Sequence, residues 1–203
     1  MNPSAFLALQ DLDTALDVIT HQRPRLPEVI AHQQAAAAVA ELAAGLAEAQ
    51  QRIDAAQAAI EASEHAAGEL TKKRSRLEAQ LKTVIAPREA EALMHEIDTI
   101  NAHRSDLDDQ ELAALDEQAQ GEAAAAALTA ELPAREASLT AAQAQLAAAH
   151  ATVDAEVASL REQREAVVAG LGAESTALYE RVRKQFGGVG VARLEGSHCS
   201  GCH

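Results

Sequence analysis

A heptad repeat of apolar side chains between residues 39 and 84 constrains the fold of this chain more than any other feature. Apolar or small residues recur there at alternating steps of three and four, which is the pattern of a left-handed coiled coil. Arg74 is the one clear polar intrusion. The repeat positions are Val39, Leu42, Leu46, Ala49, Ile53, Ala56, Ile60, Ser63, Ala67, Leu70, Arg74, Leu77, Leu81 and Val84.

Prolines mark the boundaries of three expected helices. Pro24 and Pro27 lie too close together for a regular helix to contain both. Pro87 suits the first turn of a new helix, so the chain is expected to reverse at Ala86–Arg88. The three helices are expected at about 4–21, 28–85 and 88–169.

The third expected helix carries an apolar stripe that weakens in its first half. Its second half repeats aliphatic residues at strict seven-residue steps. In the first half Leu112 and Leu115 lie out of phase with the stripe, and Pro133 is expected to kink the helix further on. Polar residues occupy the seam at Arg104, Glu111 and Gln118.

These helices predict an all-α fold, an elongated antiparallel coiled-coil hairpin over residues 1–170. At about 1.5 Å per residue, the first two helices end to end match the third in length. The first helix should then lie against residues near 152–169. The composition agrees, because the chain has no Trp, two Phe and one Tyr, whereas large aromatic residues dominate globular cores.

Residues 171–203 are expected to form a small appendage with a short helix, a strand and the first half of a zinc ribbon. Cys199 and Cys202 are spaced so that both thiolates can bind one metal ion, and such a turn supplies two of the four ligands of a zinc site. His198 and His203 are further candidate ligands. Three alternatives stay open: a redox dithiol, haem attachment through Cys-x-x-Cys-His, and two unrelated exposed cysteines.

The net charge of −14 is unevenly distributed along the chain. Residues 72–88 carry a net charge of +5, residues 89–131 carry −11, and residues 181–203 carry +3. Nucleic acid binds proteins largely through its phosphates. Any RNA or DNA site should therefore lie at one of the two basic segments.

The C-terminal basic segment is the preferred nucleic-acid site, because it adjoins the cysteine pair and has Tyr179 and Phe186 nearby as stacking surfaces. The other basic segment is expected mainly to pair with acids of the facing helix and so fix the register. The C-terminal patch consists of Arg181, Arg183, Lys184 and Arg193, and the secondary patch of Lys72, Lys73, Arg74 and Arg76.

Several protein classes are not expected. The sequence has no nucleophile elbow, phosphate loop or acid–base pair, so we do not expect an enzyme. It has no run of 18 uncharged apolar residues and no evident signal peptide, so we expect a cytoplasmic protein without membrane association. Thiols stay reduced in the cytoplasm, which favours metal binding over a disulfide for the two cysteines.

Three stretches of the chain resemble a bacterial family of nucleic-acid-binding proteins with a long coiled-coil hairpin followed by a small four-cysteine zinc ribbon. The first stretch is the opening helix and its loop, the second is the start of the long return helix, and the third is the entry into the ribbon. They comprise residues 9–13 with 26–27, residues 87–97 with 107–109, and residues 179–183 with 190–192 and 199–203.

The resemblance implies that Cys199 and Cys202 are the first two zinc ligands. The family's second Cys-x-x-Cys is absent here, so the zinc site is incomplete in this chain. The resemblance also implies a non-enzymatic adaptor. Its ligand would be RNA or DNA at the basic C-terminal knuckle, which is the C-terminal patch together with the adjoining cysteine pair. Alternatively, the ligand would be a protein of the transcription or secretion machinery that binds the coiled-coil scaffold. The oligomeric state is left open.

Overall fold

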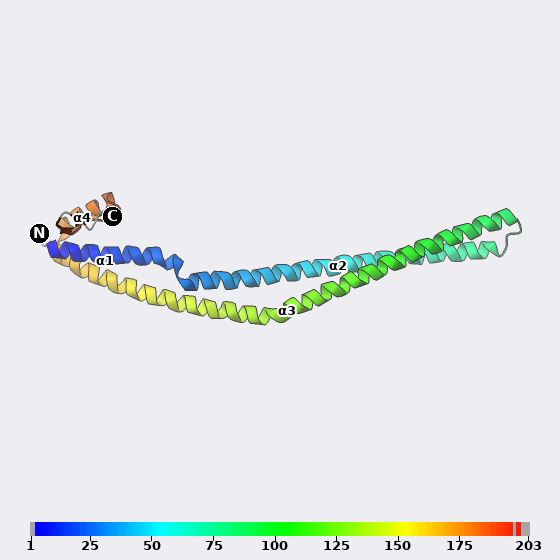
Figure 1. Cartoon of the computed structure of the whole chain (residues 1–203), viewed down its shortest axis with the longest axis horizontal. Helices are drawn as coiled ribbons and strands as arrows, with labels where there is room; N and C mark the ends of the chain where they lie inside the picture. Colours follow the sequence, from blue (N-terminus) through cyan, green and yellow to red (C-terminus); the bar gives the residue numbers. More distant parts are fainter. Residues whose placement is uncertain (1–2, 197, 200–203) are drawn as a thin grey trace. The chain divides into compact units, whose positions relative to one another are not determined.

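The computed structural model describes residues 3–196, 198 and 199, and most of them are helical (Figure 1). Proline begins each of the three long helices. The expected all-α coiled-coil hairpin is confirmed, although the second helix ends about four residues earlier than the sequence predicted. The elements are α1 (Pro3–Gln22), a 3-10 turn (Arg23–Arg25), α2 (Pro27–Leu81), α3 (Pro87–Leu171), α4 (Ala173–Gln185), β1 (Leu194–Glu195) and β2 (His198–Cys199).

The chain divides into two compact units. Unit 1 combines Met1–Ala36 with Ala137–His203, and unit 2 is Ala37–Glu136. Helix α3 passes through Pro133 without ending, although proline removes one backbone hydrogen bond at that point. None of the helices in the described part of the chain is long and apolar enough to span a membrane.

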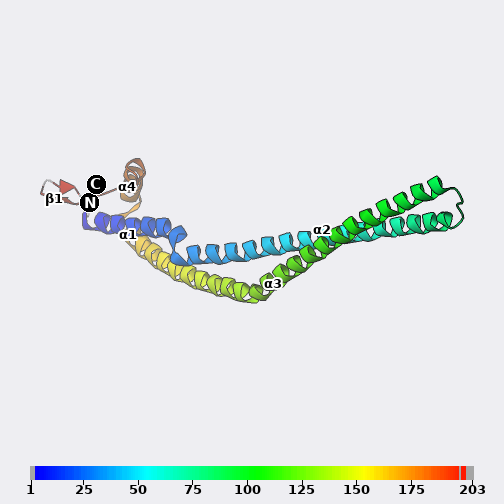
Figure 2. The same cartoon turned by 45° about the vertical axis from the view of Figure 1, so that its right-hand side comes forward.

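Unit 2 is an antiparallel pair of helices formed by most of α2 and the first half of α3, which run side by side in both views (Figures 1 and 2). The turn begins where the amides of Thr83 and Val84 both donate to the Gln80 carbonyl, at 2.9 and 3.2 Å. Pro87 then opens α3, where its missing N–H would have had no helical partner.

The seam of unit 2 follows the heptad repeat. Small residues allow the helices to approach closely, and a Cβ added at Gly121 would lie 2.9 Å from Ile53 Cγ1. The repeat positions of α2 are all buried or partly buried, which confirms that they form the face packed against α3. The buried apolar residues of the seam are Leu42, Ala49, Ala56, Ile60 and Leu77 from α2, and Ile100, Leu107 and Ala114 from α3.

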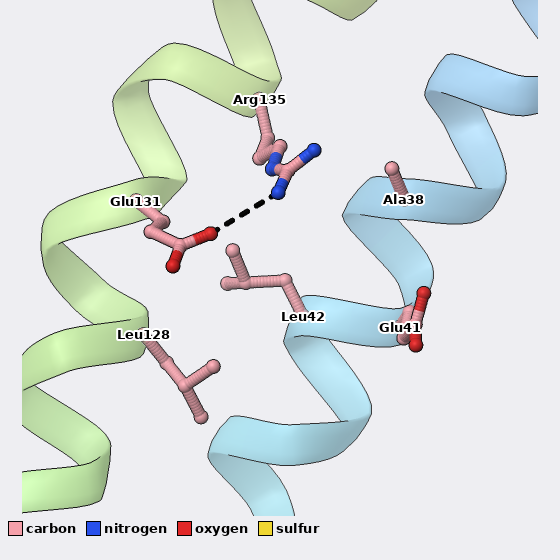
Figure 3. Close-up of a pocket in the computed structure, with 6 residues that line it drawn as sticks. All are labelled: Ala38, Glu41, Leu42, Leu128, Glu131 and Arg135. Carbon is pink, nitrogen blue, oxygen red and sulfur yellow. Dashed lines mark hydrogen bonds and ion pairs between the residues drawn. The ribbon is translucent and has the colours of Figure 1, made fainter.

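A close-up of one end of this seam shows how the helices meet. Leu42 extends from α2 toward α3, close to Leu128 and to the Glu131–Arg135 ion pair (Figure 3). These side chains line an open cleft of about 240 Å³ together with two further residues of α2. The ion pair lies within α3, at 3.2 Å between Arg135 Nη2 and Glu131 Oε2.

Unit 1 packs α1 against the end of α3 and against α4. Its core is built on Phe6, Leu9 and Tyr179. The Phe6 and Tyr179 rings have centroids 6.3 Å apart and are tilted by 35°. Arg23 pairs with Asp154 of α3 at 3.0 Å, so the first helix lies against the segment that the hairpin lengths predicted. Partly buried Val167, Val168, Leu171 and Val191 surround the core.

Candidate functional site

Helix α4 begins at a break that only glycine accommodates easily. Gly172 separates α3 from α4 with a φ of 79°, in the left-handed region where a side chain would be strained. The chain therefore turns after α3, and α4 packs beside α1. This placement buries the Tyr179 ring, which is 2% exposed.

A buried polar network joins α1, α3 and α4 beneath Tyr179. The Tyr179 hydroxyl lies 2.8 Å from Asp13 Oδ2 and 3.2 Å from Gln10 Oε1. Arg164 Nε donates to Asp13 Oδ1 at 2.7 Å, and Arg183 Nε lies 3.5 Å from Asp13 Oδ2. The Asp13 side chain is 5% exposed, and a carboxylate at such a site needs both the charge and the hydrogen bonds of its partners.

The network raises the pKa of Tyr179 and of Arg164. Burial raises the pKa of the Tyr179 hydroxyl, and its hydrogen bond to Asp13 raises it further. The pKa of Arg164 is also raised, mainly by its hydrogen bond to Asp13. These shifts keep the tyrosine neutral and the arginine charged near neutral pH, so the two groups serve Asp13 as a steady hydrogen-bond donor and a steady cation.

Gln10 holds the segment that follows α4 onto α1. Its Nε2 donates to the Gly188 carbonyl at 2.9 Å, and its Oε1 accepts from the amides of Gly190 and Val191 at 2.6 and 3.3 Å. Glycine is required at 190 because an added Cβ would lie 2.4 Å from Tyr179 Cε2. The amide of Gln10 thus fixes the backbone that leads to β1.

Two members of the predicted C-terminal patch are engaged by acids of α1. Arg183 Nη2 lies 2.5 Å from Asp17 Oδ2. Arg193 Nη2 lies 3.3 Å from Asp11 Oδ2. The sequence analysis assigned no role to Asp11 or Asp17. Their grouping with Asp13 on α1 was the signal that this helix binds cationic side chains.

The other two members of the patch, Arg181 and Lys184, are exposed and form no ion pair within the described residues. Lys184 borders a cleft of about 520 Å³ between α1 and α4. The expectation that Tyr179 offers a stacking surface is wrong because its ring is buried, whereas Phe186 is 62% exposed. The cleft is lined by Asp17, His21, Glu180, Arg183, Lys184, Gly187 and Gly188.

The secondary basic patch in unit 2 is mostly ion-paired. Lys73 crosses to Glu96 of α3 at 2.7 Å, so the expected pairing with acids of the facing helix holds for this member of the patch. Lys72 and Arg74 instead bind acids of their own helix, at 2.6 Å to Glu69 and 3.3 Å to Glu78. Such exposed pairs contribute little stability each. Of these three pairs, only Lys73–Glu96 joins α2 to α3 and can favour one register of the two helices.

The first candidate zinc ligand lies at the end of a small β-hairpin. Strand β1 pairs antiparallel with β2, so that Leu194 faces Cys199. Gly196 forms the turn with a φ of 63°. The alternating sequence of residues 189–194 predicted a strand there, but β1 begins only at Leu194. Cys199 is partly buried and is not in a disulfide.

The remaining candidate ligands, Cys202 and His203, lie outside the described residues, as does the side chain of His198. The described residues contain no group of three His, Cys, Asp or Glu that could hold a metal ion. The chemistry of a cysteine pair at this spacing fits two positions of a zinc site. Zinc binding stays a prediction.

Comparison with known proteins gives relatives that match almost the whole chain. The uncharacterized protein MT2288 of Mycobacterium tuberculosis strain CDC 1551 is 32% identical over 203 residues, which cover 98% of this chain and 81% of that protein. The same values hold for the uncharacterized protein Rv2229c of strain H37Rv.

Solved structures with the same fold include examples from Chlamydia, Mycobacterium and Helicobacter. The structure of CT398 from Chlamydia trachomatis has a TM-score of 0.82 at 24% identity and covers 98% of this chain and 84% of that one. A Mycobacterium smegmatis structure has a TM-score of 0.73 at 21% identity, covering 97% and 82%. HP0958 from Helicobacter pylori has a TM-score of 0.74 at 12% identity, covering 98% and 83%.

The model of one protein family matches residues 9–187, which contain most of α1 and all of α2, α3 and α4. The matched region includes Gln10, Asp13 and Tyr179, so the polar network lies within it as well as the heptad seam. The chain therefore belongs to the family of the CT398-like coiled-coil hairpin domain.

Proposed function

We propose that this protein is a non-enzymatic, cytoplasmic adaptor that binds a protein partner through its coiled-coil hairpin. One contrast supports the proposal most strongly. The C-terminal cations Arg183 and Arg193 are engaged by acids of α1, while α3 carries exposed acids and two exposed leucines, Leu112 and Leu115. The exposed surface of α3 around these leucines is therefore acidic and partly apolar.

The non-enzymatic character is supported by what the charged groups do. The buried ones bind one another in the Asp13 network, where the pKa values of Tyr179 and Arg164 are both raised. Acids such as Asp108 and Asp109 lie on exposed helix surface, in contact with solvent.

The experiment is capture from a lysate of the source cells with the full-length protein as bait, with and without nuclease. An unrelated acidic coiled coil of similar length serves as the control bait. We expect one protein to be retained in stoichiometric amount, by this bait only and after nuclease treatment. Retention of nucleic acid alone, or of the same proteins by both baits, would contradict the proposal.

A second candidate function is binding of RNA, or else DNA, at the C-terminal knuckle. It is favoured by exposed Arg181 and Lys184, which have no ion-pair partner among the described residues. If both contact phosphates, changing them to Ala should reduce the salt dependence of log K by roughly 1.4 to 1.8. The control is Lys72→Ala with Lys73→Ala, because those cations are already paired.

Zinc would belong to this second function. Cys199 and Cys202 would supply two of the four ligands, and the metal would order the segment that presents the knuckle. Because two thiolates leave two coordination positions open, we expect weak zinc binding by the monomer. Metal analysis after dialysis tests this, with Cys199→Ser as the control. Stoichiometric zinc in the monomer would implicate His198 or His203.

A further inference from the structure

Two leucines face outward side by side on α3. Leu112 is 64% exposed and Leu115 is 44% exposed. Residues three apart on a helix are surface neighbours, so these two side chains form one apolar spot. The seam at this level is closed by Leu107 and Ala114, which are both buried. Leucine gives no advantage over alanine in helix propensity, so the helix does not need leucine at these outward positions.

Acids surround this apolar spot without cations to neutralise most of them. Six acids and no Lys or Arg occur between residues 106 and 117. Glu117 pairs with Arg52 at 2.8 Å. Within the described part of the chain, the other acids form no ion pair; they are Asp106, Asp108, Asp109, Glu111 and Asp116. The stretch 53–71 of α2 adds four acids and again no Lys or Arg.

We propose that this surface binds a basic amphipathic helix of a partner protein. We define the acidic leucine face as Asp108, Asp109, Leu112, Leu115 and Asp116. A partner helix with apolar residues at steps of three and four would cover the leucines, and flanking Lys or Arg would meet the acids. The inference rests on the proposed adaptor function and specifies its surface and the chemistry of its partner.

Charge argues against the other occupants. Nucleic acid and anionic membranes would be repelled by the acids. A second copy of this chain offers the basic segment 72–88, but Lys72, Lys73 and Arg74 are already paired with Glu69, Glu96 and Glu78. The other cations of that segment, Arg76, Lys82 and Arg88, are spread over 13 residues. A separate helix with more closely spaced cations therefore fits the face better.

The probe is a synthetic Leu/Lys peptide of about 18 residues, roughly five helical turns, with leucines along one face. A scrambled peptide of the same composition lacks that face. Fluorescence anisotropy with the full-length protein should show binding of the amphipathic peptide, and affinity should fall as salt is raised. The scrambled peptide should bind at least about tenfold more weakly, a difference of about 1.4 kcal/mol.

The variants locate the binding. Leu112→Ala with Leu115→Ala should weaken binding at least about tenfold, as expected for the centre of a small interface. The matched control is Ile85→Ala, since Ile85 is 96% exposed in the turn between α2 and α3.

Asp108→Asn with Asp109→Asn should reduce the salt dependence of peptide binding, whereas Glu162→Gln with Glu165→Gln on the same helix should not. All these positions are exposed, so helix content by circular dichroism should stay unchanged.

Equal affinity for both peptides, or no loss in the leucine variant, would overturn the inference. So would a dimer in sedimentation that the leucine variant converts to monomer, because the face would then belong to a second copy. The two proposals can fail separately. A specific partner captured equally by wild type and the leucine variant would leave the adaptor function standing and remove the face. Peptide binding at the face without any captured partner would support the face and contradict the adaptor function.

Discussion

The hydroxyl of Tyr179 lies 2.8 Å from Oδ2 of Asp13, a residue 166 positions earlier in the chain. This hydrogen bond joins α4 to α1, and the same carboxylate accepts from Arg164 of α3. Three helices therefore depend on one buried acid. The first three predictions concern this network and the segment that it holds.

Asp13→Asn should destabilise unit 1 by about 2–3 kcal/mol. Removing one partner of a buried ion pair costs about 3–5 kcal/mol, and the lower figure applies because Arg164 and Arg183 keep roughly a quarter of their side chains in solvent. Urea unfolding followed by circular dichroism measures the change. The control is Asp11→Asn, whose exposed pair with Arg193 should contribute no more than about 1 kcal/mol. Equal effects of the two changes would contradict the network.

Tyr179→Phe should keep the ring packed against Phe6 and lose about 1–2 kcal/mol with the hydroxyl. In the wild type the pKa of Tyr179 is raised by burial above its ordinary value of 10.0. Below pH 10 neither the folded nor the unfolded state ionises this group, so its contribution is fully present. Above pH 10 the unfolded state loses the proton first, and stability should fall by up to about 1.4 kcal/mol per pH unit.

The pH effect can be assigned to Tyr179 directly because the chain contains one Tyr. The ultraviolet absorbance of the phenolate should therefore appear well above pH 10 in the folded protein and near pH 10 in urea. The Phe variant should lack the part of the alkaline stability loss that this group causes. A folded protein that titrates at pH 10 would show that the hydroxyl is in contact with solvent.

Gly190→Ala should release the segment after α4 from α1. The added Cβ would lie 2.4 Å from the Tyr179 ring, and such overpacking costs about 1–3 kcal/mol. Limited trypsin digestion should then cut faster at Arg193, whose backbone follows the segment bound by Gln10. Gly170→Ala is the matched control, because nothing lies within 4 Å of its added Cβ in α3, where Ala favours the helix by up to about 1 kcal/mol.

Leu107→Ala and Leu112→Ala should differ in stability although they lie five residues apart on one helix. Leu107 is buried in the seam and Leu112 is exposed. The buried change should cost at least about 2 kcal/mol, and the exposed change should stay within about 0.5 kcal/mol. Unfolding by urea compares them. Similar losses for both would show that Leu112 is covered, for example by a second copy of the chain.

The sequence by itself determined the helices, their hairpin arrangement and the buried faces of α2. The heptad steps from Val39 to Val84 are local information, because each step fixes which side of one helix is apolar. Pro27 and Pro87 mark helix starts for an equally local reason, since their fixed φ suits a first turn. Helix lengths alone were enough to predict that α1 faces the end of α3.

Only the tertiary structure decided what the charged and polar side chains of unit 1 do. The sequence predicted that Arg183 and Arg193 bind phosphate, but in the structure they pair with Asp17 and Asp11 of α1. It also predicted that Tyr179 is a stacking surface, but the packing of α4 buries its ring next to Asp13. Periodicity along one helix shows which face is apolar, but the partner of a charge depends on which distant residue the packing brings within a few ångströms.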